Sequence, residues 1–508
     1  MNLSVVLEMA AAGFGDRVVA GRRAHGFSAA QLLELSVGGA RLVQSHDADA
    51  VVFLDVNGPA FPVALFAAAR AGVPLVPLNY RLADEQLAKL LARHPGAVAI
   101  GRSAAQLDTR IGVRAWTAAE WLAACETEGG VEGAAEPADE AAVIIYTSGT
   151  TSEPKGALLS HQNLLSYVWG TVEFASAGAE EASLVSVPPY HIAAVANTIT
   201  NLYAGRRTIV LDQFDGAQWL ELVRAEGVTH ALVVPTMLAR IVGTDGDRSV
   251  PTLRSLAYGG ASMPPQVIAE ALTVWPHVDF VNAYGLTETS STISVLGPQE
   301  HRAALDSGDP VVRARLGSAG RPVPSVEVEI RAEDGSALPA GVVGRIWVRG
   351  EQVSGRYVGS GSTLGVDGFF DTRDEGQLDS EGYLFVAGRA DDTIIRGGEN
   401  IAPAEIEQVI LGHPDVLDVV VVGVPDPEWG QHLEAAVVAK PGHQVDPEEL
   451  RTFVRQRLRG SKTPDRILVW ADLPRTETGK IIRREALTQI QQDRRRSATT
   501  GTSLDSVR

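Results

Sequence analysis

Cysteine is almost absent from this chain, which contains one, Cys125, among 508 residues. A single cysteine cannot form an intramolecular disulfide, and it cannot supply a cysteine-based metal site. The sequence around it, WLAACETEGG, provides no recognisable setting for a catalytic thiol. We therefore expect Cys125 to be a structural residue in a protein of a reducing compartment.

Basic residues and long apolar runs are also scarce. Lysine and arginine number 44 against 62 aspartates and glutamates, and the resulting net charge of −18 argues against general binding to nucleic acids or anionic membranes. No apolar run approaches the roughly 20 residues that cross a bilayer. The N-terminus lacks the basic and hydrophobic regions of a secretory signal. We expect a cytoplasmic protein without nucleic-acid or membrane partners.

The chain is too long for a single hydrophobic core, so we expect two or more domains. Near its start, a strand-like run at 50–56, a helical pattern at 58–72 and another strand-like run at 73–79 follow one another. This βαβ order predicts a parallel sheet with helices on its faces. The same alternation resumes through 206–212 and 229–238.

The pattern changes from about residue 310. Period-two alternation with turn signals at 326–350 predicts antiparallel strands or a small barrel. Further on, a helix, two strands and another helix predict a compact α+β module. These four elements are expected at 402–412, 417–423, 434–440 and 447–458.

These patterns predict an α/β fold with two domains. The large N-terminal domain, 1–390, is expected to hold parallel and mixed sheets with helices and a small β-barrel-like subdomain at about 310–390. A mobile α+β C-terminal domain is expected at 391–490. The end, 491–508, is polar and aperiodic, so we expect it to be disordered.

The segment YTSGTTSEPKG, 146–156, follows an apolar run and has the features of a phosphate-binding loop. It does not fit the Walker spacing, because Gly149 and Lys155 are six residues apart and Gly156 follows the lysine. A turn at Gly149 lets backbone N–H groups point inward, while hydroxyls and Lys155 add donors and charge. An ordinary Ser/Thr/Gly turn remains an alternative. The candidate phosphate-binding residues are Thr147, Ser148, Gly149, Thr150, Thr151 and Lys155.

The segment YGLTET, 284–289, follows the apolar run VDFVNA. Its side chains are therefore expected at the carboxyl end of a strand, where α/β proteins build their sites. Glu288 can hold Mg²⁺ through one carboxylate, with phosphate oxygens and waters as the other ligands. Tyr284 offers a flat face for a base, and Thr287 a hydroxyl for a phosphate. Taken alone, Glu288 is more often a surface carboxylate.

Two further segments carry candidate nucleotide contacts. In 369–392, Asp374 can accept hydrogen bonds from a ribose diol, and Arg389 can donate to ribose or phosphate. In LPRTETGKIIRREAL, 473–487, Lys480 follows a glycine in a polar loop ahead of a basic helix. A lysine on such a loop is usually only solvated.

In this order, these segments resemble the adenylate-forming superfamily of acyl-CoA synthetases, luciferases and nonribosomal adenylation domains, over roughly 10–488. The resemblance is closest to acyl- or aryl-CoA ligases. It implies activation of a carboxylic acid by ATP as an acyl-adenylate with pyrophosphate release, then transfer to CoA. It also implies Mg²⁺ at Glu288, a small-molecule acid as the partner, and a monomer or homodimer.

The resemblance assigns individual roles. The loop 147–156 is expected to bind the β- and γ-phosphates of ATP, and Lys480 to bridge the substrate carboxylate and the α-phosphate. Glu288, Thr287 and His191 are the other expected catalytic residues. The expected adenine and ribose contacts are Gly259, Gly260, Ala261, Asn282, Tyr284, Gly285, Asp374 and Arg389.

A second set of roles concerns the thiol. Asp391 matches the hinge about which the C-terminal domain swings, and 396–407 matches the loop that lines the pantetheine tunnel. The tunnel residues carried over are Gly397, Gly398 and Glu399. Adenylation and thiol attack need different groups near one carbonyl, and a swing that withdraws Lys480 meets that need.

The acid pocket is expected to be lined by small or moderately polar side chains. His191 matches a position where an aromatic residue or histidine gates this pocket, although a lone histidine is more often structural. A bulky aromatic or medium acyl acid fits as well as an aliphatic one, and we favour an arylic or medium-chain carboxylate. The expected pocket residues are His191, Ala194, Asn197, Thr236, Gly260 and Ser290.

Three positions depart from the common family pattern. Ser152 and Ala194 stand where glycine is more usual; the serine suits phosphate binding, and the alanine can narrow the pocket entrance. Asp465 replaces a frequent basic residue near the expected approach of the CoA nucleotide, which weakens the case for free CoA. Loading of a carrier protein, or adenylation without a thioester, such as nitrite activation for diazotisation of an aryl amine, therefore remains an alternative. A non-catalytic nucleotide-binding relative is disfavoured by Lys480 and Glu288.

Overall fold

The computed structural model describes residues 1–101, 114–128, 141–147, 154–396, 399–427, 429–458, 460–476 and 479–501, with backbone alone at Asn400 and 495–501. The chain divides into two compact units. Unit 1 comprises Met1–Gly260, Glu270–Val328 and Trp347–Asp371, and unit 2 comprises Ala261–Ala269, Glu329–Ile346 and Thr372–Arg508. Residues 372–390 thus group with the C-terminal part, whereas the predicted boundary follows residue 390, and that boundary stays a prediction.

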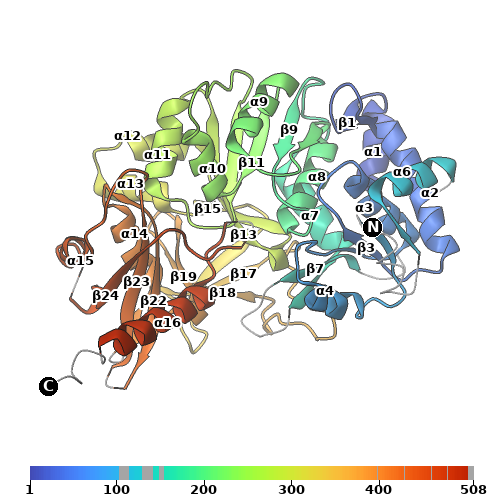
Figure 1. Ribbon diagram of the computed structural model, residues 1–508. Helices are drawn as coiled ribbons and strands as arrows, with labels where there is room; N and C mark the ends of the chain where they lie inside the picture. The colour runs from blue at the N-terminus through green and yellow to red at the C-terminus, as the bar shows by residue number, and fades with distance from the viewer. Residues whose placement is uncertain are drawn as a thin grey trace. The chain divides into compact units, whose positions relative to one another are not determined.

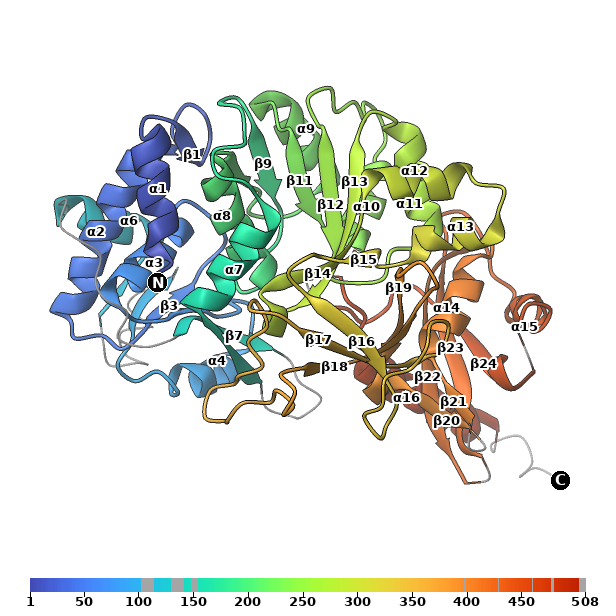
Figure 2. The same cartoon turned by 180° about the vertical axis from the view of Figure 1, so that it is seen from behind.

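A nine-stranded sheet dominates unit 1, in the order β15-β14-β13-β12-β11-β9-β10-β1-β2. Its strands β1, β10, β9, β11, β12 and β13 are parallel to their neighbours, while β2, β14 and β15 pair antiparallel. Figure 2 shows β9, β11, β12 and β13 side by side. The strands are β1 (Val18–Ala20), β2 (Phe27–Ser28), β9 (Ala182–Val185), β10 (Arg207–Val210), β11 (His230–Val233), β12 (Ser255–Gly259), β13 (Asp279–Leu286), β14 (Ser291–Leu296) and β15 (Arg321–Pro322).

Helices connect these strands, as the predicted α/β alternation requires. In the ribbon, α9 and α10 lie beside β11 (Figure 1). The segment 229–238, through which the α/β alternation was expected to resume, contains β11 and the start of α10, and Pro235 occupies the first turn of that helix. The helices that accompany this sheet are α8 (Ile192–Ala204), α9 (Gly216–Glu226), α10 (Pro235–Val242), α11 (Pro265–Val274), α12 (Pro298–Asp306) and α13 (Pro310–Ala314).

A six-stranded sheet in unit 1 follows the order β6-β5-β3-β4-β7-β8. Strands β3 and β4 are parallel and are joined by α3, which confirms the predicted βαβ unit. Phe53, Phe61 and Trp121 are fully buried in the core beside this sheet. Cys125 is buried in the same core, and burial raises the pKa of its thiol to about 12, so it is structural as expected.

The elements around the six-stranded sheet have the following bounds. The strands are β3 (Val51–Leu54), β4 (Leu75–Pro77), β5 (Val98–Gly101), β6 (Ala115–Trp116), β7 (Ala141–Thr147) and β8 (Lys155–Ser160). The helices are α1 (Ser4–Phe14), α2 (Ala29–Ser45), α3 (Ala60–Ala71), α4 (Asp84–Leu91), α6 (Ala118–Thr127) and α7 (His161–Thr171).

The β-rich region predicted from residue 310 contains a four-stranded sheet in the order β16-β17-β18-β19. Its first two strands confirm the strands predicted at 326–350. Strands β18 and β19 pair antiparallel, with Asp374 opposite Arg389. The four strands are β16 (Glu327–Arg331), β17 (Gly344–Arg349), β18 (Phe370–Leu378) and β19 (Leu384–Arg389).

The C-terminal part of unit 2 is a five-stranded sheet with helices, which confirms the predicted α+β module. The order is β21-β20-β23-β22, and β24 pairs with β23 on a branch. In Figure 1, α16 lies along β22. The elements are β20 (Ile394–Arg396), β21 (Glu399–Ile401), α14 (Pro403–Leu411), β22 (Val416–Asp426), β23 (Gly430–Ala439), α15 (Pro447–Arg455), β24 (Arg466–Trp470) and α16 (Arg483–Gly501).

The start of the predicted disordered tail is helical instead. Helix α16 continues from Arg483 through Gly501, and 502–508 lie outside the described residues. Arg494 Nε lies 3.0 Å from Oε1 of the buried Glu434, so the helix is anchored to β23 beyond residue 491. A polar segment without clear apolar periodicity can therefore be helical when one of its side chains contacts a buried residue elsewhere in the fold.

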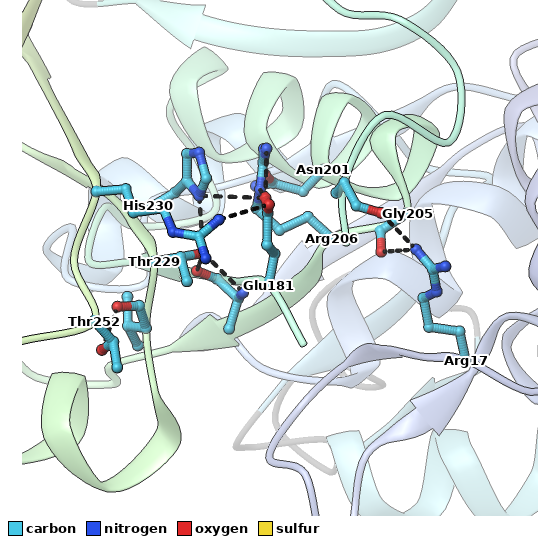
Figure 3. Close-up of polar contacts among 12 residues, drawn as sticks. Arg17, Glu181, Asn201, Gly205, Arg206, Thr229, His230 and Thr252 are labelled. Carbon is cyan, nitrogen blue, oxygen red and sulfur yellow. Dashed lines mark hydrogen bonds and ion pairs between the residues drawn. The ribbon is translucent and has the colours of Figure 1, made fainter. Parts of the chain in front are cut away.

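A polar network supports the amino-terminal edge of the nine-stranded sheet (Figure 3). Arg206, just before β10, donates from Nε and Nη2 to Glu181 Oε2 at 3.3 Å. His230 Nδ1 at the start of β11 lies 3.8 Å from the same oxygen, and Thr229 Oγ1 donates to Ala182 O at 3.0 Å. Burial and the neighbouring Arg206 lower the pKa of His230 to about 4. The network therefore ties three strand starts together with a neutral histidine at pH 7.

None of the described helices combines the length and the apolar character that crossing a bilayer requires.

Candidate active site

The carboxyl end of β13 is shaped by a tight turn. The strand runs directly into the 3-10 helix η1 (Thr287–Thr289), and β14 then returns antiparallel. Ser290 and Ser291 adopt positive φ values of 55° and 112°. A Cβ atom on Gly285 would overlap a backbone oxygen of β14, so glycine is needed for the close approach of the two strands. This turn carries the predicted magnesium ligand, Glu288.

The Glu288 carboxylate is held by a tyrosine that the sequence analysis missed. Tyr357 Oη donates a hydrogen bond to Glu288 Oε1 at 2.8 Å. The ammonium of Lys155 lies 5.8 Å from the centre of the same ring, within the range of a cation–π contact. All three residues belong to unit 1. Tyr357 therefore links the predicted phosphate lysine to the predicted magnesium ligand.

Backbone hydrogen bonds of residues 354–358 fix this arrangement. Ser354 N donates to Glu288 O at 2.8 Å, and Val358 N donates to Gly156 O at 2.8 Å. Helix η1 and the start of β8 are thus held against one segment. The sequence signal for the tyrosine is weak, a single aromatic residue in a glycine- and serine-rich stretch. Its partners are distant in the chain, so no local motif contains all three residues.

The two ends of the predicted phosphate loop face each other. Thr147 on β7 and Lys155 on β8 are directly paired across the antiparallel strands, and Thr147 Oγ1 donates to Lys155 O at 3.3 Å. The hairpin therefore brings the first hydroxyl and the lysine of the loop together. The remaining predicted phosphate-binding residues, Ser148, Gly149, Thr150 and Thr151, lie outside the described residues, as does Ser152.

The carboxyl end of β12 lies beside β13, and two glycines end it. A Cβ atom on Gly259 would overlap a backbone oxygen of β13, and Gly260 has a φ of 82°, so both positions favour glycine. The Asn282 amide donates to a backbone oxygen just before β15 at 2.9 Å. Of the other predicted residues in this region, Tyr284 and Thr236 are half-buried and Ala261 is exposed.

Helix α8 presents the predicted acid-pocket residues of its first turns. His191 is the N-cap residue, and its ring centre lies 4.7 Å from that of Tyr190. Burial lowers the pKa of His191 to about 4, so its imidazole is neutral at pH 7. Ala194 is fully buried, and the Asn197 amide donates to the carbonyl oxygen four residues earlier at 2.9 Å. A neutral ring suits a gate beside an organic acid better than a permanent charge.

Ser290, the last predicted pocket residue, is engaged elsewhere. Its hydroxyl is fully buried and donates to Gln352 O at 2.9 Å. Gln352 Nε2 in turn donates to Thr289 O at 3.0 Å and to Thr292 O at 2.8 Å. These contacts give Ser290 a structural role in the turn after η1.

In unit 2, the predicted ribose-binding residues form an ion pair. Arg389 Nε lies 2.9 Å from Asp374 Oδ1, and the two residues face each other across β18 and β19. Arg389 Nη1 also donates to Thr372 O at 3.2 Å. Asp374 is buried, while Arg389 is partly exposed. An ionised carboxylate can accept several hydrogen bonds, which is the chemistry that a ribose diol requires of its partner.

Lys480 belongs to the same cluster of unit 2. Desolvation by its surroundings lowers the pKa of Lys480, and Arg389 lowers it further, whereas Asp374 and Asp392 oppose this effect. The backbone holds the lysine on a turn, because Gly479 has a φ of 78° and Thr476 N donates to Lys480 O at 2.7 Å. Lys480 is exposed, and its ammonium lies within electrostatic range of the Asp374–Arg389 pair.

The predicted hinge and tunnel residues also fall in unit 2. Asp391 is exposed in the 3-10 helix η3 (Ala390–Asp392), directly after β19. Glu399 is half-buried at the start of β21 and pairs with Arg396 across the β20–β21 hairpin. Gly397 and Gly398 lie outside the described residues.

The comparisons with known proteins agree with this geometry. The sequence model of the AMP-binding enzyme family matches residues 7–358, and that of the AMP-binding enzyme C-terminal domain matches residues 405–480. The chain belongs to the AMP-binding enzyme family. This confirms the predicted superfamily and fold class.

Similar proteins are acid ligases of related types. A feruloyl-CoA synthase of Amycolatopsis sp is 34% identical, with 91% of this chain and 94% of that protein covered. A fatty acid–[acyl-carrier-protein] ligase of Streptomyces coeruleorubidus is 33% identical, with 86% of each chain covered. The o-succinylbenzoate CoA synthetase of Bacillus subtilis, solved with its acyl-adenylate, superposes with a TM-score of 0.82 at 27% identity, with 95% of this chain and 97% of that one covered.

This AMP-binding enzyme is therefore an AMP-forming acid–thiol ligase, the class that adenylates an acid and joins it to a thiol. Among the described residues, no group of three or more histidines, cysteines, aspartates or glutamates could hold a metal ion. Mg²⁺ bound with ATP commonly uses one or two carboxylates, with phosphate oxygens and water as its other ligands. The half-buried Glu288 at the end of β13 fits that requirement.

Proposed function

We propose that this enzyme converts a medium-sized organic acid, arylic or medium-chain, into its acyl-adenylate with pyrophosphate release, and then transfers the acyl group to CoA. The observation that carries the proposal is the Asp374–Arg389 ion pair of unit 2, with Lys480 within electrostatic range of it. An Asp–Arg pair can bind the ribose of ATP, and a lysine near that pair is then near the α-phosphate. The carboxylate must attack the α-phosphate for pyrophosphate to be released.

In the first half-reaction, a carboxylate oxygen of the acid attacks the α-phosphorus of ATP. The bond between the α-phosphorus and the bridging oxygen breaks, and pyrophosphate leaves with the electron pair. Two anions must approach each other, so the main tasks are positioning and charge stabilisation. Lys480 is proposed to hold the carboxylate against the α-phosphate, while Lys155 holds the departing phosphates. The Tyr357 contacts keep Lys155 and Glu288 in place.

Mg²⁺ is proposed to bind at Glu288 together with the phosphates, where it would neutralise negative charge. Glu288 Oε1 already accepts from Tyr357, which limits the rotation of the carboxylate. The Thr287 hydroxyl, on the same turn, is proposed to donate to a phosphate oxygen.

In the second half-reaction, the sulfur of CoA attacks the acyl carbonyl. The thiol proton leaves, the bond between the carbonyl carbon and the AMP oxygen breaks, and AMP departs. Different groups are needed beside the carbonyl for this step, so a hinge at Asp391 is proposed to withdraw Lys480 and to present the loop that follows Arg396.

A cavity of about 550 Å³ in unit 1 is lined by Thr198 and Leu202 of α8 and by apolar side chains such as Val19 and Ile209. The predicted acid-pocket residues are not among the residues that line this cavity, so it does not indicate the acid. The proposed acid class is supported by the small and moderately polar side chains at the predicted pocket positions, such as Ala194 and Asn197, and by the similarity to a feruloyl-CoA synthase.

The acceptor is proposed to be free CoA. Asp465, which the sequence analysis counted against CoA, has its carboxylate occupied by Arg396 Nη2 at 2.8 Å and by Leu433 N at 3.0 Å. It is therefore a structural acceptor and need not repel a nucleotide. Carrier-protein loading is the second candidate, favoured by the similarity to the acyl-carrier-protein ligase.

A pyrophosphate-release assay over aryl, medium-chain and short acids and nitrite, with and without CoA, tests the proposal. The expected result is pyrophosphate release with an aryl or medium-chain acid and an acyl-CoA product when CoA is present. Pyrophosphate release with no acyl-CoA for any acid would refute the CoA-ligase assignment. A product on a supplied carrier protein would then favour the second candidate.

A further inference from the structure

The short hairpin β20–β21 packs on the core of its module through Ile394 and Ile401, which are both buried. Strand β20 has three residues, and a single register pair, Arg396 with Gly430, joins it to β23. One side-chain contact adds to this pair, from Ile395 N to Gln431 Oε1 at 2.7 Å. The paired Ile394 and Ile401 hold one end of the hairpin, and Arg396 lies at the other end. Arg396 is held there by polar contacts from another segment of unit 2.

We propose that residues 461–465, here called the clamp segment, hold this hairpin in the position that presents the thiol to the acyl group. Asp465 and Lys462 are then positioning residues for the second half-reaction, and this role rests on the proposed function. The clamp segment contacts Arg396 of β20 and Glu405 of α14, the helix that follows the hairpin.

The first contact of the clamp segment is made by Asp465. Its Oδ1 accepts from Arg396 Nη2 at 2.8 Å, and its Oδ2 accepts from Leu433 N at 3.0 Å. Asp465 N donates in turn to Leu433 O at 2.7 Å, and Arg396 Nη1 donates to Ser461 O at 3.3 Å. The carboxylate therefore bridges the end of β20 and the middle of β23. The Arg396 side chain is 17% exposed and that of Asp465 is 41% exposed, so solvent screens this charge pair in part.

The second contact is made by Lys462. Its Nζ donates to both carboxylate oxygens of Glu405, at 2.8 and 2.6 Å. Glu405 lies in the first turn of α14, directly after β21, and the lysine side chain is 15% exposed. Strand β20 and the helix that follows the hairpin are thus both connected to one stretch of five residues.

This geometry also explains why an acidic residue stands at 465. A basic side chain there could not accept from Arg396 or from the Leu433 amide. Arg396, which precedes the predicted tunnel loop, has Asp465 Oδ1 as its hydrogen-bond acceptor. The contact with Arg396 in the same unit therefore explains why Asp465 departs from the common family pattern.

The first test uses Asp465→Asn, with Asp415→Asn as its matched control. Asp415 carries a similar contact in the same unit, to His443 Nδ1 at 2.6 Å, but it does not touch the hairpin. In Asp465→Asn, kcat/KM for CoA should fall about five- to tenfold, as expected for a partly buried charged contact. Acid-dependent ATP–pyrophosphate exchange should change less than about twofold. Lys462→Met should show the same split, and Asp415→Asn should change neither rate.

The second test is independent of the acceptor. Hydrogen–deuterium exchange of peptides that cover 394–404 should rise in Asp465→Asn and Lys462→Met relative to the wild type and Asp415→Asn. Unchanged exchange would overturn the clamp. Raised exchange with an unchanged CoA step would overturn its role in thiol presentation. A wild type that releases pyrophosphate but forms no acyl-CoA would instead refute the proposed function, and the exchange data would still decide whether the clamp exists.

Discussion

Replacement of Tyr357 by phenylalanine tests the link between the phosphate lysine and the magnesium ligand. The change removes the hydrogen bond of 2.8 Å to Glu288 and keeps the ring beside Lys155. A hydrogen bond to a charged group contributes about 1.5–3 kcal/mol, and we take the lower end because Glu288 is only half-buried. About 1.5 kcal/mol corresponds to a loss of about tenfold in kcat/KM for ATP.

The assay is acid-dependent ATP–pyrophosphate exchange, measured over a range of ATP and Mg²⁺ concentrations. If Tyr357 acts through Glu288, the effect of Tyr357→Phe should shrink to less than about twofold in a Glu288→Gln background, because coupled residues are not additive. Tyr357→Leu should cost more, since Lys155 then also loses the ring. Full additivity of the two substitutions, or a lower KM for ATP in Tyr357→Phe, would refute the argument.

Three further outcomes are expected. Lys480→Ala should slow adenylation about 100-fold or more but leave thioester formation from supplied acyl-adenylate largely unchanged. Equal losses of rate in the two half-reactions would contradict the use of a different domain arrangement for each. Burial lowers the pKa of His191 and His230 to about 4 from 6.5. As the pH falls, these histidines are therefore protonated in the unfolded state before they are protonated in the folded state. Urea denaturation should show full stability above about pH 6.5 and a loss of about 1 kcal/mol per histidine by pH 5. Arg494→Ala removes a partner of the buried Glu434, so thermal unfolding should show a loss of about 1 kcal/mol.

The fold was largely predictable because its signals are local. The apolar runs around β3 and β4 and the helical pattern of α3 each lie within a few residues, and the structure has them where they were expected. The apolar run at 229–238 covers both a strand and the start of a helix, and Pro235 marks the change. The helix over 491–501 depends on the contact of Arg494 with Glu434, which no local pattern contains.

The site was predictable only in part, for a physical reason. Glu288, Lys155 and Lys480 stand in recognisable strings, so the resemblance identified them. Tyr357 contacts residues from two distant segments, and its role exists only after the chain has folded. Asp465 was noticed as a departure, but its meaning depends on Arg396, which only the structure places beside it.

The central claim is that the acid attacks the α-phosphorus of ATP and that AMP later leaves from the acyl group. Reaction of an active acid labelled with ¹⁸O in its carboxylate, followed by mass spectrometry of the products, tests this most directly. One labelled oxygen is expected in AMP and none in pyrophosphate, and the other carboxylate oxygen is expected in the acyl-CoA. Unlabelled AMP, or label in pyrophosphate or phosphate, would contradict it.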